Sequence, residues 1–71
     1  MNPAPPFDAR RVRALLAAER ITHEQYAAAC RLPKTNVSSF LTEKLQPSER
    51  KRQLLHDGLL ALGLDPEVLY A

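Results

Sequence analysis

The chain has 71 residues, which is enough for one small domain and too few for a multi-step enzyme with its own cofactor-binding fold. Hydrophobic residues make up 45% and charged residues 25%, as in ordinary globular domains, despite six prolines. All ten lysines and arginines lie in residues 1–52 beside five acids, whereas residues 53–71 carry three acids and no such base, so a basic body precedes an acidic, leucine-rich end.

The first seven residues differ in composition from the rest. Three of the six prolines fall here and no apolar periodicity is present, so we expect residues 1–7 to form a flexible, proline-rich arm. Residues 8–71 are expected to form a single domain. No stretch shows the alternation of a strand, and the domain is therefore predicted to be all-α and compact, with four to five helices.

The first predicted helix spans residues 9–20. Asp8 is a good N-cap, because its side chain can accept from a free amide of the first turn. Phe7 and Val12 flank that cap at the spacing of a hydrophobic staple, which predicts that both side chains are buried.

The second predicted helix, residues 23–31, has the clearest start in the chain. Thr22 and Gln25 stand three residues apart and form a capping box, in which each side chain accepts from the other residue's amide. Pro33 lacks an amide hydrogen and restricts the residue before it, so this helix is expected to end near Arg31.

Three more helical segments are expected toward the C-terminus. A helix over residues 34–45 should end before Pro47, and Pro47 should be the first residue of a helix over residues 47–62. Gly63 is placed to cap that helix, and a last turn is expected over residues 66–70.

The predicted helix over residues 34–45 has two chemically distinct faces. At about 100° per residue, short uncharged polar side chains share one stripe: Thr35, Ser38, Ser39 and Thr42. The opposite stripe is apolar: Val37, Phe40 and Leu41. A solvated face more often carries Glu and Lys, whereas short hydroxyl side chains allow a close approach to base edges in a DNA groove. This face therefore favours DNA contact, with a solvated helix face as the alternative.

The run from Thr22 to Thr42 resembles the helix-turn-helix of the lambda-repressor-like (Cro and phage-repressor type) regulators. The matching positions are the cap, the large apolar residue, the small residue at the helix crossing, the apolar turn residue and two buried positions of the second helix: Thr22, Tyr26, Ala27, Leu32, Val37 and Phe40. Arg31 departs from the pattern, since the family prefers glycine there for a backbone with positive φ. A turn that differs in detail is therefore expected.

The resemblance and the charge pattern together define the expected contacts with double-stranded DNA. Base contacts are expected from one face of the second helix: Lys34, Thr35, Ser38, Ser39 and Thr42. Phosphate contacts are expected from the start of the first helix of the motif and from cations around it: Thr22, His23, Lys44, Arg50 and Lys51. His23 stands where the family often has a phosphate-binding glutamine, and the alternative for the basic run 50–52 is a solvated face.

The resulting hypothesis is a small phage-type, repressor-like transcriptional regulator that binds a palindromic operator. One recognition helix contacts few base pairs, so a homodimer through the leucine-rich C-terminal segment is expected, with packing of that segment over the core as the alternative. A second hypothesis is a DNA-binding module, because residues 36–45 and the run after them are similar to the N-terminal domain of Mu-type transposition target-capture ATPases. A third is a helical protein-interaction module or antitoxin that does not bind DNA.

Other classes of function lack the residues they need. Two histidines 33 residues apart and one cysteine match no zinc pattern, two glycines make no phosphate-binding loop, and no catalytic residues or small-molecule substrate site are expected. No enzyme activity and no cofactor are therefore predicted, and Cys30 is expected to be a core residue. No apolar run approaches the ~18 residues of a membrane span, so a cytoplasmic protein without membrane contact is expected.

Overall fold

A computed structural model of the chain describes residues 7–70, which contain helices and their connections and no strand. The elements in chain order are α1 (Ala9–Ala18), α2 (His23–Cys30), α3 (Lys34–Leu41), α4 (Glu49–Ala61) and the 3₁₀ helix η1 (Pro66–Tyr70). The all-α prediction is confirmed. Residues 1–6 of the expected arm lie outside the described residues, and the assignment of Phe7 to that arm is wrong, because its side chain is buried at 6% exposure.

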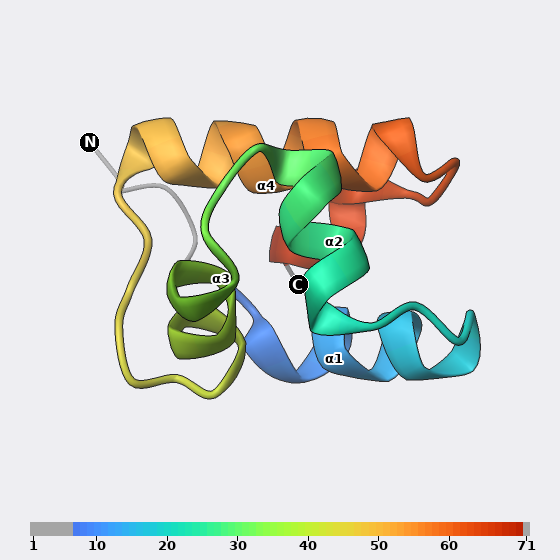
Figure 1. Cartoon of the computed structure of the whole chain (residues 1–71), viewed down its shortest axis with the longest axis horizontal. Coiled ribbons are helices and arrows are strands. Elements are labelled where there is room, and N and C mark those ends of the chain that lie inside the picture. The colour runs from blue at the N-terminus through green and yellow to red at the C-terminus, as the bar shows by residue number, and fades with distance from the viewer. Residues whose placement is uncertain (1–6, 71) are drawn as a thin grey trace.

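The two longest helices, α1 and α4, lie on opposite sides of the domain, and α2 lies between them (Figure 1). α4 runs along one side and α1 along the other, and α2 crosses from the α1 side to α4. α2 packs against both α3 and α4, while η1 packs against α1 and α4. The domain measures 37 × 22 × 18 Å along its principal axes.

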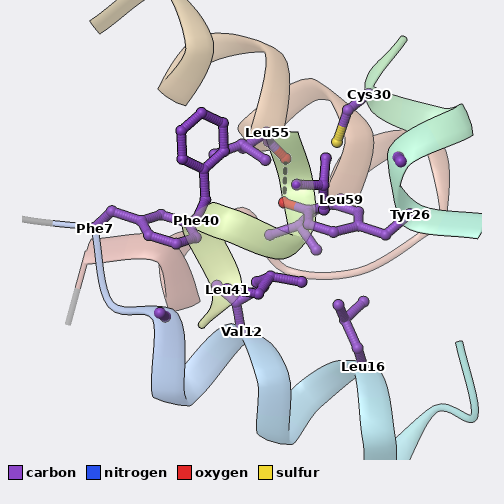
Figure 2. Packing of buried hydrophobic residues seen from close by; sticks show 12 residues of the cluster. Phe7, Val12, Leu16, Tyr26, Cys30, Phe40, Leu41, Leu55 and Leu59 are labelled. Carbon is purple, nitrogen blue, oxygen red and sulfur yellow. Dashed lines mark hydrogen bonds between the residues drawn. The ribbon is translucent and has the colours of Figure 1, made fainter. Parts of the chain in front are cut away.

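One apolar core joins these elements (Figure 2). Its largest fully buried side chains come from all four α-helices and include Leu16, Tyr26, Leu41, Leu55 and Leu59. The Tyr26 hydroxyl donates a hydrogen bond of 2.8 Å to the Leu55 carbonyl oxygen, which satisfies the polar end of a side chain that has no exposed surface. The core thus ties α2 to α4.

Side-chain caps define the starts of α1, α2 and α4, and the sequence indicates the first two of them. The Asp8 carboxylate accepts from the Arg11 amide at 3.1 Å, and the capping box of Thr22 and Gln25 is present in both directions. The prediction that Pro47 opens α4 is wrong. Ser48 is the N-cap, with its hydroxyl accepting from the Lys51 amide at 3.3 Å, and Pro47 is buried ahead of the helix.

Each α-helix ends in the same hydrogen-bond pattern. A residue with positive φ follows the helix, and the next amide bonds back to a carbonyl five residues earlier, at 2.8 Å for Ile21 to Leu16 and 2.9 Å for Lys44 to Ser39. Gly63 takes this position after α4 with φ 76°, which confirms its predicted role. After the other three helices the position is held by Arg20, Arg31 and Glu43, at φ between 57° and 63°.

These endings shorten the helices relative to the predictions. α3 ends at Leu41 instead of residue 45, α1 ends at Ala18 instead of residue 20, and α2 and α4 each end one residue earlier than predicted. The cause is the left-handed residue, which turns the chain out of the helix before the next proline is reached. Arg31 has φ 60°, the left-handed backbone for which the resemblance associates glycine with this position.

The C-terminal segment mostly packs over the core. Leu59 is fully buried, and Leu62, Leu64 and Val68 are partly buried against the core, whereas Leu60 remains 54% exposed. The alternative expected from the sequence, packing of this segment within one chain, therefore accounts for most of its described apolar side chains.

Candidate nucleic-acid interface

The two faces of α3 differ in burial as predicted. Val37, Phe40 and Leu41 are at most 3% exposed and face the core. The predicted base-contacting residues lie on the other side: Lys34, Thr35 and Thr42 are exposed, and Ser38 and Ser39 are half-buried. Lys34, Thr35, Ser38 and Ser39 thus lie on the accessible side of this eight-residue helix, and Thr42 directly follows it as the C-cap.

The polar side chains on this face are not equivalent. The Thr42 hydroxyl donates to the Ser38 carbonyl oxygen at 2.7 Å, so its hydrogen is engaged within the helix. The Ser38 hydroxyl lies 3.5 Å from His23 Nδ1. Among the described residues, no hydrogen bond engages the side chains of Lys34, Thr35 or Ser39, so these three have their full hydrogen-bonding capacity available for a partner.

The start of α2 lies beside this face. The side chains of Thr22 and Gln25 each accept a hydrogen bond from the other residue's backbone amide. The distance is 3.0 Å from the Gln25 amide to Thr22 Oγ1 and 2.8 Å from the Thr22 amide to Gln25 Oε1. This box fixes the backbone around His23, the first residue of α2. The contact between His23 and Ser38, 15 residues apart, then joins the start of α2 to the polar face of α3.

The structure places the predicted phosphate-contacting cations in two segments, the connection after α3 and the first turn of α4. Lys44 is exposed immediately after the turn at Glu43, and Arg50 is exposed in the first turn of α4. Lys51 lies with its Nζ 5.8 Å from the centre of the Phe40 ring, a cation–π arrangement that holds it against the apolar flank of α3. Lys51 therefore lies beside the Phe40 flank of the helix rather than on its polar stripe.

Arg13 is a residue of this region that is not among the predicted DNA-contacting residues. Its guanidinium donates from Nη1 to the Leu41 carbonyl oxygen, the last residue of α3. A cation at a helix C-terminus satisfies a carbonyl that has no partner within the helix. Arg10 and Arg11 stand next to it in the chain and are exposed, and no local pattern distinguishes Arg13 from them.

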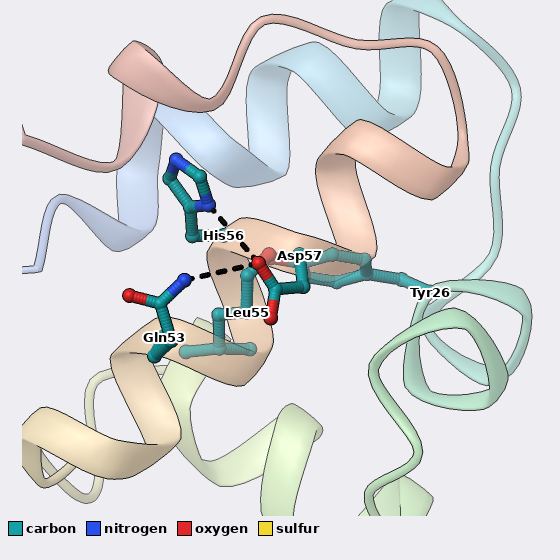
Figure 3. A network of polar contacts seen from close by, with 5 residues as sticks. All are labelled: Tyr26, Gln53, Leu55, His56 and Asp57. Atoms are coloured by element: carbon teal, nitrogen blue, oxygen red, sulfur yellow. Dashed lines mark hydrogen bonds and ion pairs between the residues drawn. The ribbon is translucent and has the colours of Figure 1, made fainter.

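The other polar groups of residues 7–70 form no reactive cluster. On the outer side of α4, Asp57 Oδ1 accepts from Gln53 at 3.0 Å and lies 3.3 Å from His56 Nδ1 (Figure 3). Burial raises the pKa of the Cys30 thiol to about 11, which keeps it protonated, in accord with the predicted core role. Within residues 7–70 no group of three potential metal ligands occurs, and none of the helices is long and apolar enough to cross a bilayer.

Comparison of the chain with protein-family models, with curated proteins and with solved structures found no match. We therefore infer a function from the residues of α2, α3 and α4 and from their geometry.

Proposed function

We propose that this protein binds double-stranded DNA in a sequence-dependent manner, with α3 in the major groove, as a small repressor-type transcriptional regulator. The observation that carries the proposal is the accessible stripe of short polar side chains on α3, opposite a fully buried apolar face. α3 is roughly 12 Å long for its eight residues. A helix of this size fits a major groove about 12 Å wide and spans a few base pairs.

The available side chains suit base edges. Lys34 can donate to guanine O6 and N7, and the hydroxyls of Thr35 and Ser39 can donate to or accept from several bases. Lys44 and Arg50 are exposed and would contact phosphates of the DNA backbone. The net charge of +2, with every Lys and Arg in residues 1–52, favours a polyanionic partner.

Dimerisation is part of the proposal, because one short helix reads too few base pairs for a unique operator. A palindromic site would present each half to one subunit. The C-terminal segment remains the proposed contact. Leu60 of α4, at 54% exposure, is the most exposed large apolar side chain among the described residues of this segment, whereas its neighbours Leu59 and Leu62 are engaged in the core. A regulator of this kind would act in the cytoplasm, and a phage origin stays part of the same proposal.

The first test is affinity for duplex DNA as a function of salt. With several phosphate contacts per subunit, the affinity should fall by orders of magnitude between about 50 and 200 mM salt. A flat salt response, or no binding at low salt, would exclude both DNA hypotheses and leave a protein-interaction module.

The second test separates base reading from phosphate contact. Selection of bound sequences from a random duplex pool should give a changed preference for Thr35→Ala and Ser39→Ala, at about 1–3 kcal/mol per lost base contact. Lys44→Ala and Arg50→Ala should weaken all sequences alike and reduce the salt slope by about 1 each. Gln53→Ala, on the outer side of α4, is the control and should change neither. If Thr35→Ala and Ser39→Ala weakened binding to all DNA sequences equally, α3 would not be the helix that contacts the bases.

The transposition-type module remains the second DNA hypothesis, and the selection separates it from an operator-binding regulator. A strong palindromic consensus supports the regulator. Salt-dependent binding without a consensus favours the module, whose DNA contacts would serve a neighbouring domain.

A further inference from the structure

His23 and Ser38 form a pair whose hydrogen-bond direction depends on the charge of the histidine. Nδ1 of His23 and Oγ of Ser38 are 3.5 Å apart, and both side chains are half-buried between the start of α2 and the polar stripe of α3. A hydroxyl can donate one hydrogen and accept through its oxygen, whereas a ring nitrogen does one or the other. The protonation state of His23 therefore decides whether the Ser38 hydroxyl can donate a hydrogen bond to a third group or only accept one.

With a neutral ring that carries its hydrogen on Nε2, Nδ1 is an acceptor. The Ser38 hydroxyl then donates to Nδ1, and its oxygen can only accept from a third group. With a protonated ring, Nδ1 donates to the Ser38 oxygen. The hydroxyl hydrogen of Ser38 is then released and can donate outward, into the space in front of α3.

None of the described charged groups near this pair binds the His23 ring. The described charged groups on the segments next to the start of α2 are Glu19 and Arg20 after α1, Glu24 on α2 and Lys34 on α3. None of them forms a hydrogen bond or ion pair with His23, and His56 and Asp57 pair with each other at 3.3 Å. The second ring nitrogen, Nε2, is therefore left for a ligand.

DNA would supply that ligand. When the second helix of such a motif fills the major groove, the first helix crosses the sugar-phosphate backbone. The start of α2 adjoins the stripe through the His23–Ser38 contact, so a phosphate oxygen is the group expected at Nε2. A phosphate accepts from Nε2–H in either charge state and favours the protonated ring, because a charge-assisted hydrogen bond is stronger than a neutral one.

We propose, on the basis of the DNA binding proposed above, that His23 couples DNA affinity and base preference to pH. Protonation of His23 strengthens its phosphate contact and converts Ser38 from an acceptor into a donor toward the bases. At the base pair facing Ser38, the neutral form then prefers bases that present a donor, adenine N6 or cytosine N4. The protonated form prefers the acceptors of guanine or thymine O4. Histidine is suited to this role because it changes charge between about pH 5 and 8.

The experiment measures duplex affinity at about pH 6 and about pH 8 at constant ionic strength, the range in which histidine titrates. The wild-type protein should bind about tenfold more tightly at the lower pH, the factor expected when a charge-assisted hydrogen bond replaces a neutral one. Its salt slope should also be steeper by about 1 there, as for one added phosphate contact. His23→Gln keeps a donor and an acceptor without a titrating charge and should lose both effects. His56→Gln, which alters the other histidine, should retain them.

Selection from a random duplex pool at both pH values tests the change in readout. The preference at one base pair should shift with pH in the wild-type protein and stay constant in Ser38→Ala and His23→Gln. A pH response that persists in His23→Gln, or wild-type binding that does not depend on pH, would refute the coupling and leave the DNA-binding proposal intact. If salt-dependent binding were absent at both pH values, the pH coupling and the DNA-binding proposal would both be refuted. Equal melting temperatures of the wild-type protein and His23→Gln show that folding is unchanged.

Discussion

Gly58 lies where α4 crosses α2, and replacing it by alanine tests this crossing. A Cβ at Gly58 would lie 2.3 Å from Cys30 Sγ and 3.2 Å from both the Cys30 nitrogen and Tyr26 Cε1. Ordinary van der Waals contact needs roughly 3.5–4.0 Å. The sulfur would have to move by about 1 Å, in a core where Cys30 is 2% exposed and Tyr26 is fully buried.

Two opposing contributions determine the size of the effect. Alanine favours a helix interior over glycine by about 1 kcal/mol, which alone would stabilise the variant. Overpacking of a filled core costs about 1–3 kcal/mol, and the overlap with sulfur is severe enough to place Gly58→Ala at the upper end. We expect a net loss of about 2 kcal/mol in the free energy of unfolding, or a melting temperature lower by about 10 °C for a domain of this size.

Urea denaturation of four proteins measures the effect and its cause: wild type, Gly58→Ala, Cys30→Ala and the double variant. In the Cys30→Ala background the sulfur is absent and only the 3.2 Å contacts remain, so Gly58→Ala should become nearly neutral, which gives a coupling of about 2 kcal/mol. A single variant as stable as the wild type would refute the close crossing. An equal cost in both backgrounds would mean that the sulfur is not the obstacle.

Three further outcomes follow from the described packing. Ala27→Leu should cost about 1–3 kcal/mol because Ala27 is 2% exposed, whereas the exposed Ala28→Leu should cost little, and equal melting temperatures would contradict this difference. Arg31→Gly should stabilise the fold by roughly 1 kcal/mol, since φ is 60° there, while Gly63→Ala, at φ 76° with open space around it, should destabilise it by a similar amount; thermal unfolding checks both. Because burial raises the pKa of Cys30 to about 11, the unfolded thiol ionises before the folded one, so the stability difference between wild type and Cys30→Ala should fall as the pH rises from about 9 to 11. A constant difference over that range would show that the thiol is not desolvated.

Helix starts and buried faces were predictable because the signals are local. A cap and the amide that it accepts from are three residues apart, as at Asp8 and Thr22, so a short stretch of sequence contains the whole interaction. The apolar face of α3 follows from the helical period alone, and with it the polar stripe of the candidate interface.

Helix ends were predicted less well. The residues that end α1, α2 and α3 are Arg20, Arg31 and Glu43, which have no intrinsic preference for positive φ. After α1 and α2 the following residue is Ile21 or Leu32, and each packs against the core. Burial of that side chain stabilises a turn that the local sequence does not favour, so the signal lies in a tertiary contact.

The contacts that complete the site and the core connect distant parts of the chain. Arg13 reaches the end of α3 across 28 residues, Tyr26 reaches α4 across 29, and His23 meets Ser38 across 15. The sequence by itself determined the residue types, the starts of α1, α2 and α3, and the two faces of α3. Only the tertiary structure decided which arginine caps α3, which glycine leaves space for the Cys30 side chain, and which hydroxyl on the polar stripe lies beside a histidine. Such pairs have no sequence period, because they depend on how the helices cross.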